Sequence, residues 1–552
     1  MRCWDVSRTI RASVLRDILR GRIVQDPDPH GLRLRGARIT GRLDLEYLTS
    51  SIFVELIDCF LDGGLTARGA RLPYLSVAGS LLEHRSEPAL YAARFSASAL
   101  FLDRATFIAS CESGAVRVAG AHLGQLDIYD AVLRNNCGPA LSAEGAQVEE
   151  VLYLNGLDAM GTGLDGAVVL ANSHLGGLNC YKATLRGEGG PALNANGLQV
   201  DHDVDLRGST AIGGGIGAVR LTGAHIGGSL ECDEAEFRND SGPALYADRL
   251  QVDQSMFLRY GFTAIGDSGY GTVYLVGAHI GGHLDCTAAD LRNESGPALD
   301  AYSLQVGQGM YLGGGFTATG GGKGVAVNLT DARVGGKFVF APARLEHKAD
   351  PHQRLAVDGL IYAGVPDTGS AQGWRALLQQ GTPDYAAQPY QQLAAGHRAR
   401  GDDRQARQTL MAQRDDQLGR THPRWQERLW GWITKITLGY GYQPWRALLF
   451  LAAVVAVSCV LAVVLGSHGA LTQTSQTTTP GRSCTVVQQL SVGLDLNLPV
   501  GTSVARAACD LTTDSASAAA AWLAVVGWLL RLLAWAFAAL FIAGFTSAVR
   551  KT

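Results

Sequence analysis

Gly-Pro-Ala-Leu at residues 242–245 is one of four copies of the same tetrapeptide, and the spacing of these copies decides the fold. The other copies start at Gly138, Gly190 and Gly296, and a variant starts at Glu87. Histidines at 122, 174, 225 and 279 follow nearly the same interval of about 52 residues. A period of this length indicates stacked repeats rather than a single-copy globular enzyme.

Each repeat divides into short pieces centred on apolar residues. The pieces carry two small or apolar residues two positions apart, as in Ala224/Ile226 and Ala235/Phe237. Alternation with period two is typical of half-buried strands. Because no helical stretch separates these strands, they cannot form βαβ units. The sequence therefore predicts a solenoid that turns a corner after each pentad, with two coils of about 26 residues in each repeat.

These pentads, dominated by Ala-x-Leu, Ala-x-Phe and Ala-x-Ile, resemble pentapeptide-repeat proteins over residues 31–344. The resemblance implies a mainly β chain that folds as a right-handed, quadrilateral parallel β-helix with longer glycine-rich loops. Similar chains with a two-span membrane anchor are labelled bacterial (actinobacterial-type) membrane-associated oxidoreductases. No group of residues in the sequence supports hydride or electron transfer, so an oxidoreductase activity is implied by the resemblance alone.

The ends of a solenoid need covering because they expose unpaired strand edges. We expect an amphipathic helix from Val6 to Leu19 to cover the first coil, with Asp5 or Ser7 as its cap and Gly21 after its end. Its apolar face would consist of Ile10, Val14, Leu15, Ile18 and Leu19.

Two segments near the C-terminus are long and apolar enough to span a bilayer, 447–466 and 527–549. Basic residues before the first span and after the second place both ends, and the β-helix, in the cytoplasm of a bacterial inner membrane. The expected parts are a helical cap (1–24), β-helix repeats (25–345), a linker (346–372), a helical neck with an interfacial segment (373–446), the first span (447–466), an extracytoplasmic loop (467–515) and the second span (516–550).

Composition argues against a nucleic-acid partner. The chain has 47 basic and 50 acidic residues among 552, for a formal net charge of −3. A nucleic-acid binder is usually strongly basic. No secretory signal is expected, because Met1 to Arg20 is charged throughout.

Two tempting motifs are explained by the repeat. Gly161-Thr-Gly-Leu-Asp-Gly166 matches a dinucleotide fingerprint, but an apolar strand follows it where the fingerprint needs a helix. Cys180, Cys232 and Cys286 are two coils apart, about 10 Å, which is too far for a disulfide or a shared zinc ion. We therefore predict a corner loop and core thiols, with no catalytic, cofactor-binding or metal site.

The histidines are candidates for an interaction face. His122, His174, His225 and His279 occupy the outward place of their pentads, and Arg71 and Arg333 occupy equivalent places at the two ends of the array. A polar column of this kind can bind an anionic partner, or can simply be a solvated face repeated by duplication. The interchange of His and Arg argues against catalysis or metal binding there.

The loop between the two spans holds two further candidates. Cys484 and Cys509 lie on the oxidising side, where a disulfide can form. Residues 486–500 could re-enter the membrane as a pore loop, with Asp495 as the residue to test, although no known filter signature is present.

The sequence favours a non-enzymatic, membrane-anchored cytoplasmic β-helix scaffold that binds an unknown protein partner, with no cofactor and with homo-oligomers allowed. The alternatives are a membrane-associated oxidoreductase and a channel-like two-span protein with a cytoplasmic sensor rod.

Overall fold

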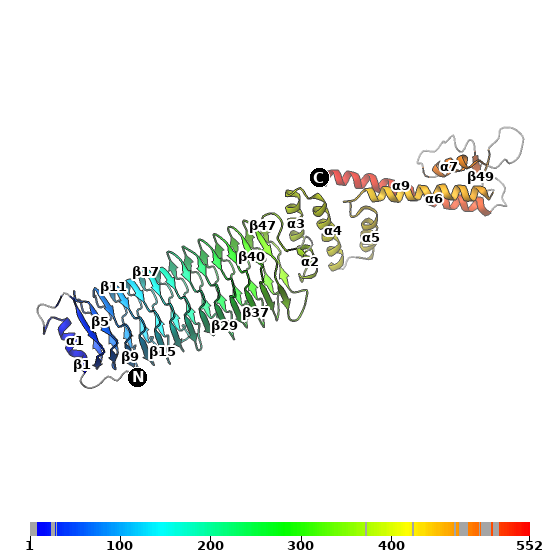
Figure 1. Cartoon of the computed structure of the whole chain (residues 1–552). Coiled ribbons are helices and arrows are strands. Elements are labelled where there is room, and N and C mark those ends of the chain that lie inside the picture. Colours follow the sequence, from blue (N-terminus) through cyan, green and yellow to red (C-terminus); the bar gives the residue numbers. More distant parts are fainter. Residues whose placement is uncertain are drawn as a thin grey trace. The chain divides into compact units, whose positions relative to one another are not determined.

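The computed structural model describes residues 8–23, 28, 30–369, 373–421, 424–468, 471–473, 484–495, 497, 509–511 and 518–551. The chain forms two compact units, Met1–Ala406 and Arg407–Thr552. The first unit is a parallel β-solenoid with helices at both ends, and the second is helical (Figure 1).

Each turn of the solenoid contributes strands to three parallel sheets. Sheet I has 14 strands and sheet II has 13, while sheet III takes one long strand or two short strands from a turn. Val219 pairs with Leu193 and with Leu245, 26 residues away on either side. The prediction of about 26 residues per coil is therefore confirmed. From β22 to β45 each turn has four strand segments, which matches the expected quadrilateral cross-section.

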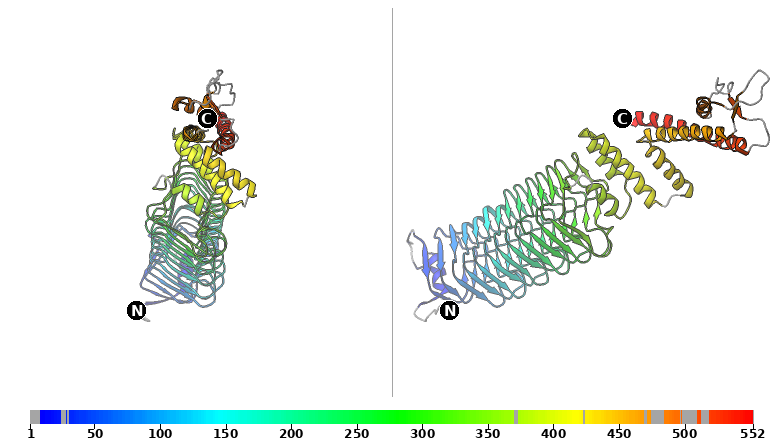
Figure 2. Two further views of the ribbon diagram at one scale, coloured as in Figure 1. Left: turned by 90° about the vertical axis from the view of Figure 1, so that its right-hand side faces the viewer. Right: turned by 45° about the vertical axis from the view of Figure 1, so that its right-hand side comes forward.

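The views in Figures 1 and 2 show strands of successive turns side by side along the solenoid. Sheet I consists of β1 (Thr9–Arg11), β3 (Arg38–Thr40), β6 (Phe60–Leu61), β9 (Leu81–His84), β12 (Thr106–Ala109), β15 (Val132–Asn135), β18 (Asp158–Gly161), β21 (Thr184–Gly187), β25 (Thr210–Gly213), β29 (Glu236–Asn239), β33 (Thr263–Gly266), β37 (Asp290–Asn293), β41 (Thr317–Gly320) and β45 (Arg344–His347). Sheet II consists of β4 (Leu43–Asp44), β7 (Leu65–Thr66), β10 (Leu90–Tyr91), β13 (Val116–Arg117), β16 (Leu141–Ser142), β19 (Val168–Val169), β22 (Leu193–Asn194), β26 (Val219–Arg220), β30 (Leu245–Tyr246), β34 (Val273–Tyr274), β38 (Leu299–Asp300), β42 (Val327–Asn328) and β46 (Leu355–Ala356). Sheet III consists of β2 (Leu32–Arg35), β5 (Val54–Ile57), β8 (Tyr74–Ser76), β11 (Ser96–Phe101), β14 (His122–Asp127), β17 (Gln147–Tyr153) and β20 (His174–Asn179), then β23 (Gln199–Val200) and β24 (Val204–Asp205), β27 (His225–Ile226) and β28 (Leu230–Glu231), β31 (Gln251–Val252) and β32 (Met256–Phe257), β35 (His279–Ile280) and β36 (Leu284–Asp285), β39 (Gln305–Val306) and β40 (Met310–Leu312), β43 (Arg333–Val334) and β44 (Phe338–Phe340), and β47 (Ile361–Tyr362).

Side-chain volume in the core explains why the sequence repeats every two turns. In sheet I, from Leu133 to Ala318, large residues on one turn pair with alanine on the next, and all of them are buried. Because neighbouring strands are about 4.8 Å apart, a large side chain fills the space that a small neighbour leaves. The alternating column is Leu133, Ala159, Leu185, Ala211, Phe237, Ala264, Leu291 and Ala318.

A buried asparagine holds the corner that precedes Gly-Pro-Ala-Leu. The side-chain amide of Asn135 donates to the carbonyls of Cys111 (2.8 Å) and Pro139 (2.6 Å). Its side-chain oxygen accepts from the amides of Cys111 and Cys137. Asn239 and Asn293 make corresponding contacts four and six turns later. One polar side chain thus joins adjacent turns and shapes the corner.

The N-terminal lid differs in part from the expected helix. Its helix, α1, spans only Ala12–Leu19, because Thr9–Arg11 form strand β1, which pairs with β3. Leu15 and Leu19 are buried as predicted, whereas Val14 is exposed. The expected caps Asp5 and Ser7 lie outside the described residues. No capping hydrogen bond from a side chain is present at Arg11, which precedes the helix.

Residues 346–372, expected to form a linker, instead continue the solenoid. Strands β46 and β47 lie in this segment and pair with β42 and β43. Helices α2 (Gly373–Gln380) and α3 (Gln388–Ala399) then follow the last turn. The side chains of Gln388 and Gln392 donate to the carbonyls of Leu360 and Tyr362, so polar groups at this end of the solenoid gain partners.

Trp374 of α2 anchors this end by apolar packing. Its ring is 5.5 Å from those of Phe338 and Phe340 and 6.2 Å from that of Tyr362, measured between ring centroids. The Trp374 side chain is buried. Three aromatic side chains of the last turns therefore surround one side chain of the capping helix.

The helices after α3 begin with α4 (Asp403–Arg420), and the second unit continues with α5 (Trp425–Leu438), α6 (Trp445–Ser467), α7 (Val486–Asp495) and α9 (Ala518–Lys551). Two short strands, β48 (Leu471–Gln473) and β49 (Cys509–Leu511), pair antiparallel. Two segments are long and apolar enough to cross a membrane, α6 and Val525–Thr546 of α9. These segments coincide with the two spans expected from the sequence.

Candidate functional site

The six residues of the expected interaction face lie in one straight column on sheet III. Strand pairing places every member in direct register with the next, and glutamines alternate with the histidines along the middle of the column. We call it the His/Gln column; its members are Arg71, Ser96, His122, Gln147, His174, Gln199, His225, Gln251, His279, Gln305 and Arg333. All of these side chains are exposed except Ser96, which is partly buried.

Two of the histidines have carboxylate partners on the following turn. Nε2 of His174 is 2.9 Å from Oδ1 of Asp201, and Nε2 of His225 is 3.1 Å from Oδ1 of Asp253. Each aspartate stands two residues after a glutamine of the column. At the same position after Gln305 stands Gly307, so His279 has no acid there. The paired imidazole rings are held in place while their other edges stay exposed.

A glycine stands two residues after each histidine of the column, where a side chain would clash with the neighbouring turn. A Cβ on Gly227 would lie 2.4 Å from the carbonyl oxygen of Asp201, and one on Gly281 would lie 2.2 Å from that of Asp253. The backbone of one turn therefore passes directly over the preceding turn at this corner. A side chain larger than glycine at these positions would therefore push the two turns apart.

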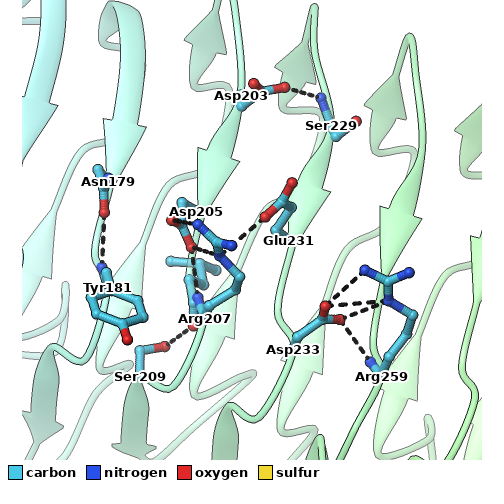
Figure 3. Close-up of polar contacts among 11 residues, drawn as sticks. Asn179, Tyr181, Asp203, Asp205, Arg207, Ser209, Ser229, Glu231, Asp233 and Arg259 are labelled. Atoms are coloured by element: carbon cyan, nitrogen blue, oxygen red, sulfur yellow. Dashed lines mark hydrogen bonds and ion pairs between the residues drawn. The ribbon is translucent and has the colours of Figure 1, made fainter.

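Beyond this corner, the second part of sheet III carries a network of paired charges (Figure 3). Arg207 contacts Asp205 at 2.7 Å and Glu231 at 3.1 Å. Arg259 contacts Asp233 at 2.8 Å, and its guanidinium lies over the ring of Phe257. Acids outnumber arginines in this network, and each of the two arginines is paired with at least one acid.

Burial and ion pairing act oppositely on the pKa values in this network. Burial raises the pKa of the Glu231 carboxyl, although the Arg207 charge beside it works in the other direction. The hydrogen bond to Asp205 raises the pKa of Arg207. The arginines therefore stay charged, and the network serves to fix side chains on the surface.

Sheet I carries a second periodic column, which is not among the residues predicted from the sequence. Arg134, Arg186, Arg238 and Arg292 are exposed or partly buried at two-turn intervals, with Met160, Ile212 and Ile265 between them. Three of the arginines have acid partners: Arg134 pairs with Asp158, Arg238 with Asp240, and Arg292 with Asp290. In the sequence, the corresponding signal is Leu/Phe-Arg-Asn/Gly, separated by two residues from each Gly-Pro-Ala-Leu corner.

The other motifs occupy structural positions. Gly161 ends β18, and β19 follows the glycine-rich corner, so this loop joins two strands as predicted. Cys180, Cys232 and Cys286 are fully buried, and burial raises the pKa of each thiol. Among the described residues, no group of three or more His, Cys, Asp or Glu side chains could hold a metal ion.

The candidates of the membrane loop lie in the second unit. Cys484 and Cys509 are joined in a disulfide. Asp495 is the last residue of α7, and its side chain is buried. No pore signature is formed by these described residues, so the pore loop stays a prediction.

Comparisons of this chain with protein-family models, curated proteins and solved structures give no match. The site is therefore interpreted from its own geometry alone.

Proposed function

We propose that this chain is a membrane-anchored scaffold whose solenoid binds another protein along the His/Gln column. The observation that carries the proposal is the continuity of the column. It runs without interruption from Arg71 to Arg333 through ten turn-to-turn pairings, which is roughly 48 Å at 4.8 Å per step. A regular surface of this length suits an extended partner, because successive turns offer the same groups at fixed spacing.

The chemistry of the column favours a protein partner. Imidazole and carboxamide groups both donate and accept hydrogen bonds, and aspartates stand beside two of the histidines. A polyanion would be repelled by these carboxylates, whereas a protein surface can match such mixed groups. The formal net charge of −3 points the same way.

Membrane anchoring by α6 and α9 is the second part of the proposal. Both helices expose apolar side chains, and Trp425, Trp430 and Trp432 of α5 are exposed, as in helices at a membrane interface. We place the solenoid in the cytoplasm of a bacterial inner membrane, following the distribution of basic residues and the resemblance to pentapeptide-repeat proteins. Cys137, an exposed thiol on the solenoid, tests this orientation. A membrane-impermeant maleimide should label it in inverted vesicles and not in intact cells.

Partner binding is tested with two matched variants of the full-length protein in native membranes. One replaces His122, His174, His225 and His279 with alanine, and the other replaces Arg134, Arg186, Arg238 and Arg292, which have the same spacing on sheet I. A photo-crosslinking residue at Gln251 reports the partner. The histidine variant should lose the crosslinked product and the arginine variant should keep it. Equal crosslinking in both variants would remove the His/Gln column from the proposal.

The competing proposal is a membrane oxidoreductase, because chains that resemble this one carry that label. Purified protein with flavin, haem or iron–sulfur absorbance would favour that activity over the scaffold.

A further inference from the structure

Helix α7 lies along the second half of α6 (Figure 1). Close contacts fix this packing. A Cβ on Gly493 would be 2.6 Å from the Cα of Cys459, and one on Gly466 would be 2.9 Å from the side chain of Gln489. The chain of α7 therefore starts near the end of α6 and runs back along it.

Asn497, which follows α7, contacts α6 well before the end of that helix. The Ser458 hydroxyl is 3.2 Å from Oδ1 of Asn497, and the Asn497 amide donates to the carbonyl of Gly493. Ser458 is nine residues before Ser467, the last residue of α6, which is roughly 13 Å along the helix axis at 1.5 Å per residue.

The length of α6 indicates the depth in a membrane at which Ser458 would lie. With 23 residues, α6 is roughly 34 Å long, little more than the ~30 Å hydrocarbon core of a bilayer. The whole helix is therefore needed to span the membrane. Ser458 then lies near the bilayer centre, and α7 lies within the half of the membrane on the side of residues 467–515.

The two faces of α7 fit a lipid environment. The face against α6 holds the buried residues Gln489, Val492, Gly493 and Asp495. The opposite face is apolar and exposed: Val486 is 63% exposed, Val487 78%, Leu490 45% and Leu494 47%. Exposing this face to water would be unfavourable, whereas in a bilayer polar groups turn toward the protein and apolar groups toward lipid.

The start of α7 is tied to the end of α6. Leu471, Cys484, Val492 and Cys509 form a small buried cluster against Leu465 of α6. The Cys484–Cys509 disulfide closes this cluster, and β48 pairs with β49 beside it. The position of α7 along α6 is thus fixed at both of its ends.

We infer that α7 is a re-entrant helix whose exposed face, Val486, Val487, Leu490 and Leu494, contacts the acyl chains of the leaflet on the side of residues 467–515. This inference rests on the membrane insertion of α6 in the proposed function. It assigns a third membrane element to the chain, in addition to the two spans.

The test uses full-length protein with Cys3→Ser, Cys137→Ser and Cys459→Ala, reconstituted in phosphatidylcholine/phosphatidylglycerol vesicles and spin-labelled at one introduced cysteine. The positions are Val487→Cys, Leu490→Cys and Leu494→Cys on α7. Val460→Cys, exposed on α6, is the lipid control, and Leu164→Cys, 82% exposed on the solenoid, is the water control. Non-reducing gel mobility verifies the native disulfide in every variant.

Oxygen, which concentrates in lipid, should relax the Leu490 and Leu494 labels severalfold more than a water-soluble nickel chelate does, as at Val460. This preference should increase from Val487 to Leu494. Quenching of a fluorophore at the same cysteines by acyl-chain nitroxide lipids gives a second reading of depth.

Preferential relaxation of the Leu490 and Leu494 labels by nickel, with Val460 still in lipid, would overturn the re-entrant helix and leave the membrane anchor standing. If the Val460 label is also in water, then both the anchor and the re-entrant helix are wrong. Partner crosslinking to the solenoid is measured separately, so its loss bears on the scaffold alone.

Discussion

The buried asparagine of the Gly-Pro-Ala-Leu corner offers a matched pair of substitutions in adjacent residues. Asn135 is 1% exposed and its side chain takes part in four hydrogen bonds to the backbone. The side chain of Asn136 is exposed. Replacing each with alanine deletes the same atoms from the same strand end, so the difference between the two variants isolates the buried contacts.

The expected cost follows from those contacts. Asn135→Ala removes two donors and one acceptor and leaves the Cys111 and Pro139 carbonyls and the Cys111 and Cys137 amides without this partner. At about 0.5–1.5 kcal/mol per net hydrogen bond, the four bonds contribute about 2–6 kcal/mol. We expect a loss of about 3 kcal/mol, because the Pro139 carbonyl keeps the Ala115 amide as a partner. Asn136→Ala should change stability by less than about 0.5 kcal/mol, as surface substitutions usually do.

Hydrogen exchange is the suitable assay, because a solenoid loses stability locally, in the turns that touch the substitution. About 3 kcal/mol corresponds to a roughly 10²-fold faster exchange at the amides of Cys111 and Cys137. Strands three or more turns away should keep their protection. Equal exchange in Asn135→Ala and Asn136→Ala, or uniform loss along the whole solenoid, would refute this reasoning.

Three further predictions concern other parts of the solenoid. Gly227→Ala should destabilise its turn by about 1–3 kcal/mol through the clash with the Asp201 carbonyl, whereas Gly269→Ala, with open space around the new Cβ, should be near neutral in denaturant unfolding. Burial raises the pKa of Asp300, so its contribution is greatest below the unfolded pKa of about 3.9 and is lost as pH rises through the folded pKa. Asp300→Asn keeps the oxygen that accepts both hydrogen bonds and should be more stable than the parent at pH 7 but not at pH 3 in thermal unfolding. Trp374→Ala should lower the stability of the last turns by about 3–5 kcal/mol and expose the amides of β44 and β47 to hydrogen exchange. Unchanged protection of the first turns would confirm that the effect is local.

Local alternation and a long period were enough to predict the solenoid, its two-turn repeat and the outward histidines. The contacts between turns were harder to predict, because the number of residues per turn varies. Leu141 pairs with Val168, 27 residues later, and Val168 pairs with Leu193 after 25. A shift of one residue moves a side chain to the other face. The sequence alone therefore could not assign Asp201 to His174.

Three strands at the C-terminal end of the solenoid are not predicted from the sequence, for a related reason. No Gly-Pro-Ala-Leu corner accompanies these strands, which are Arg344–His347, Leu355–Ala356 and Ile361–Tyr362. A proline at 351 and two histidines make the sequence of this region resemble that of a linker. In the structure His347 is buried, and its ring nitrogen accepts from the Asp350 amide within the corner. A different residue thus serves the position that Asn293 holds two turns earlier.

The two-turn period by itself does not mark a binding face. It follows from the alternation of large and small core residues, and duplication of that unit repeats whatever stands on the outside. The arginine column of sheet I has the same period as the His/Gln column, although no shared partner is implied. Both columns contain side chains paired with acids, His174 and His225 on sheet III and three of the four arginines on sheet I. What distinguishes sheet III is that polar glutamines stand between the histidines, whereas the apolar Met160, Ile212 and Ile265 stand between the arginines. The arginine variant is thus the control that separates recognition from repetition.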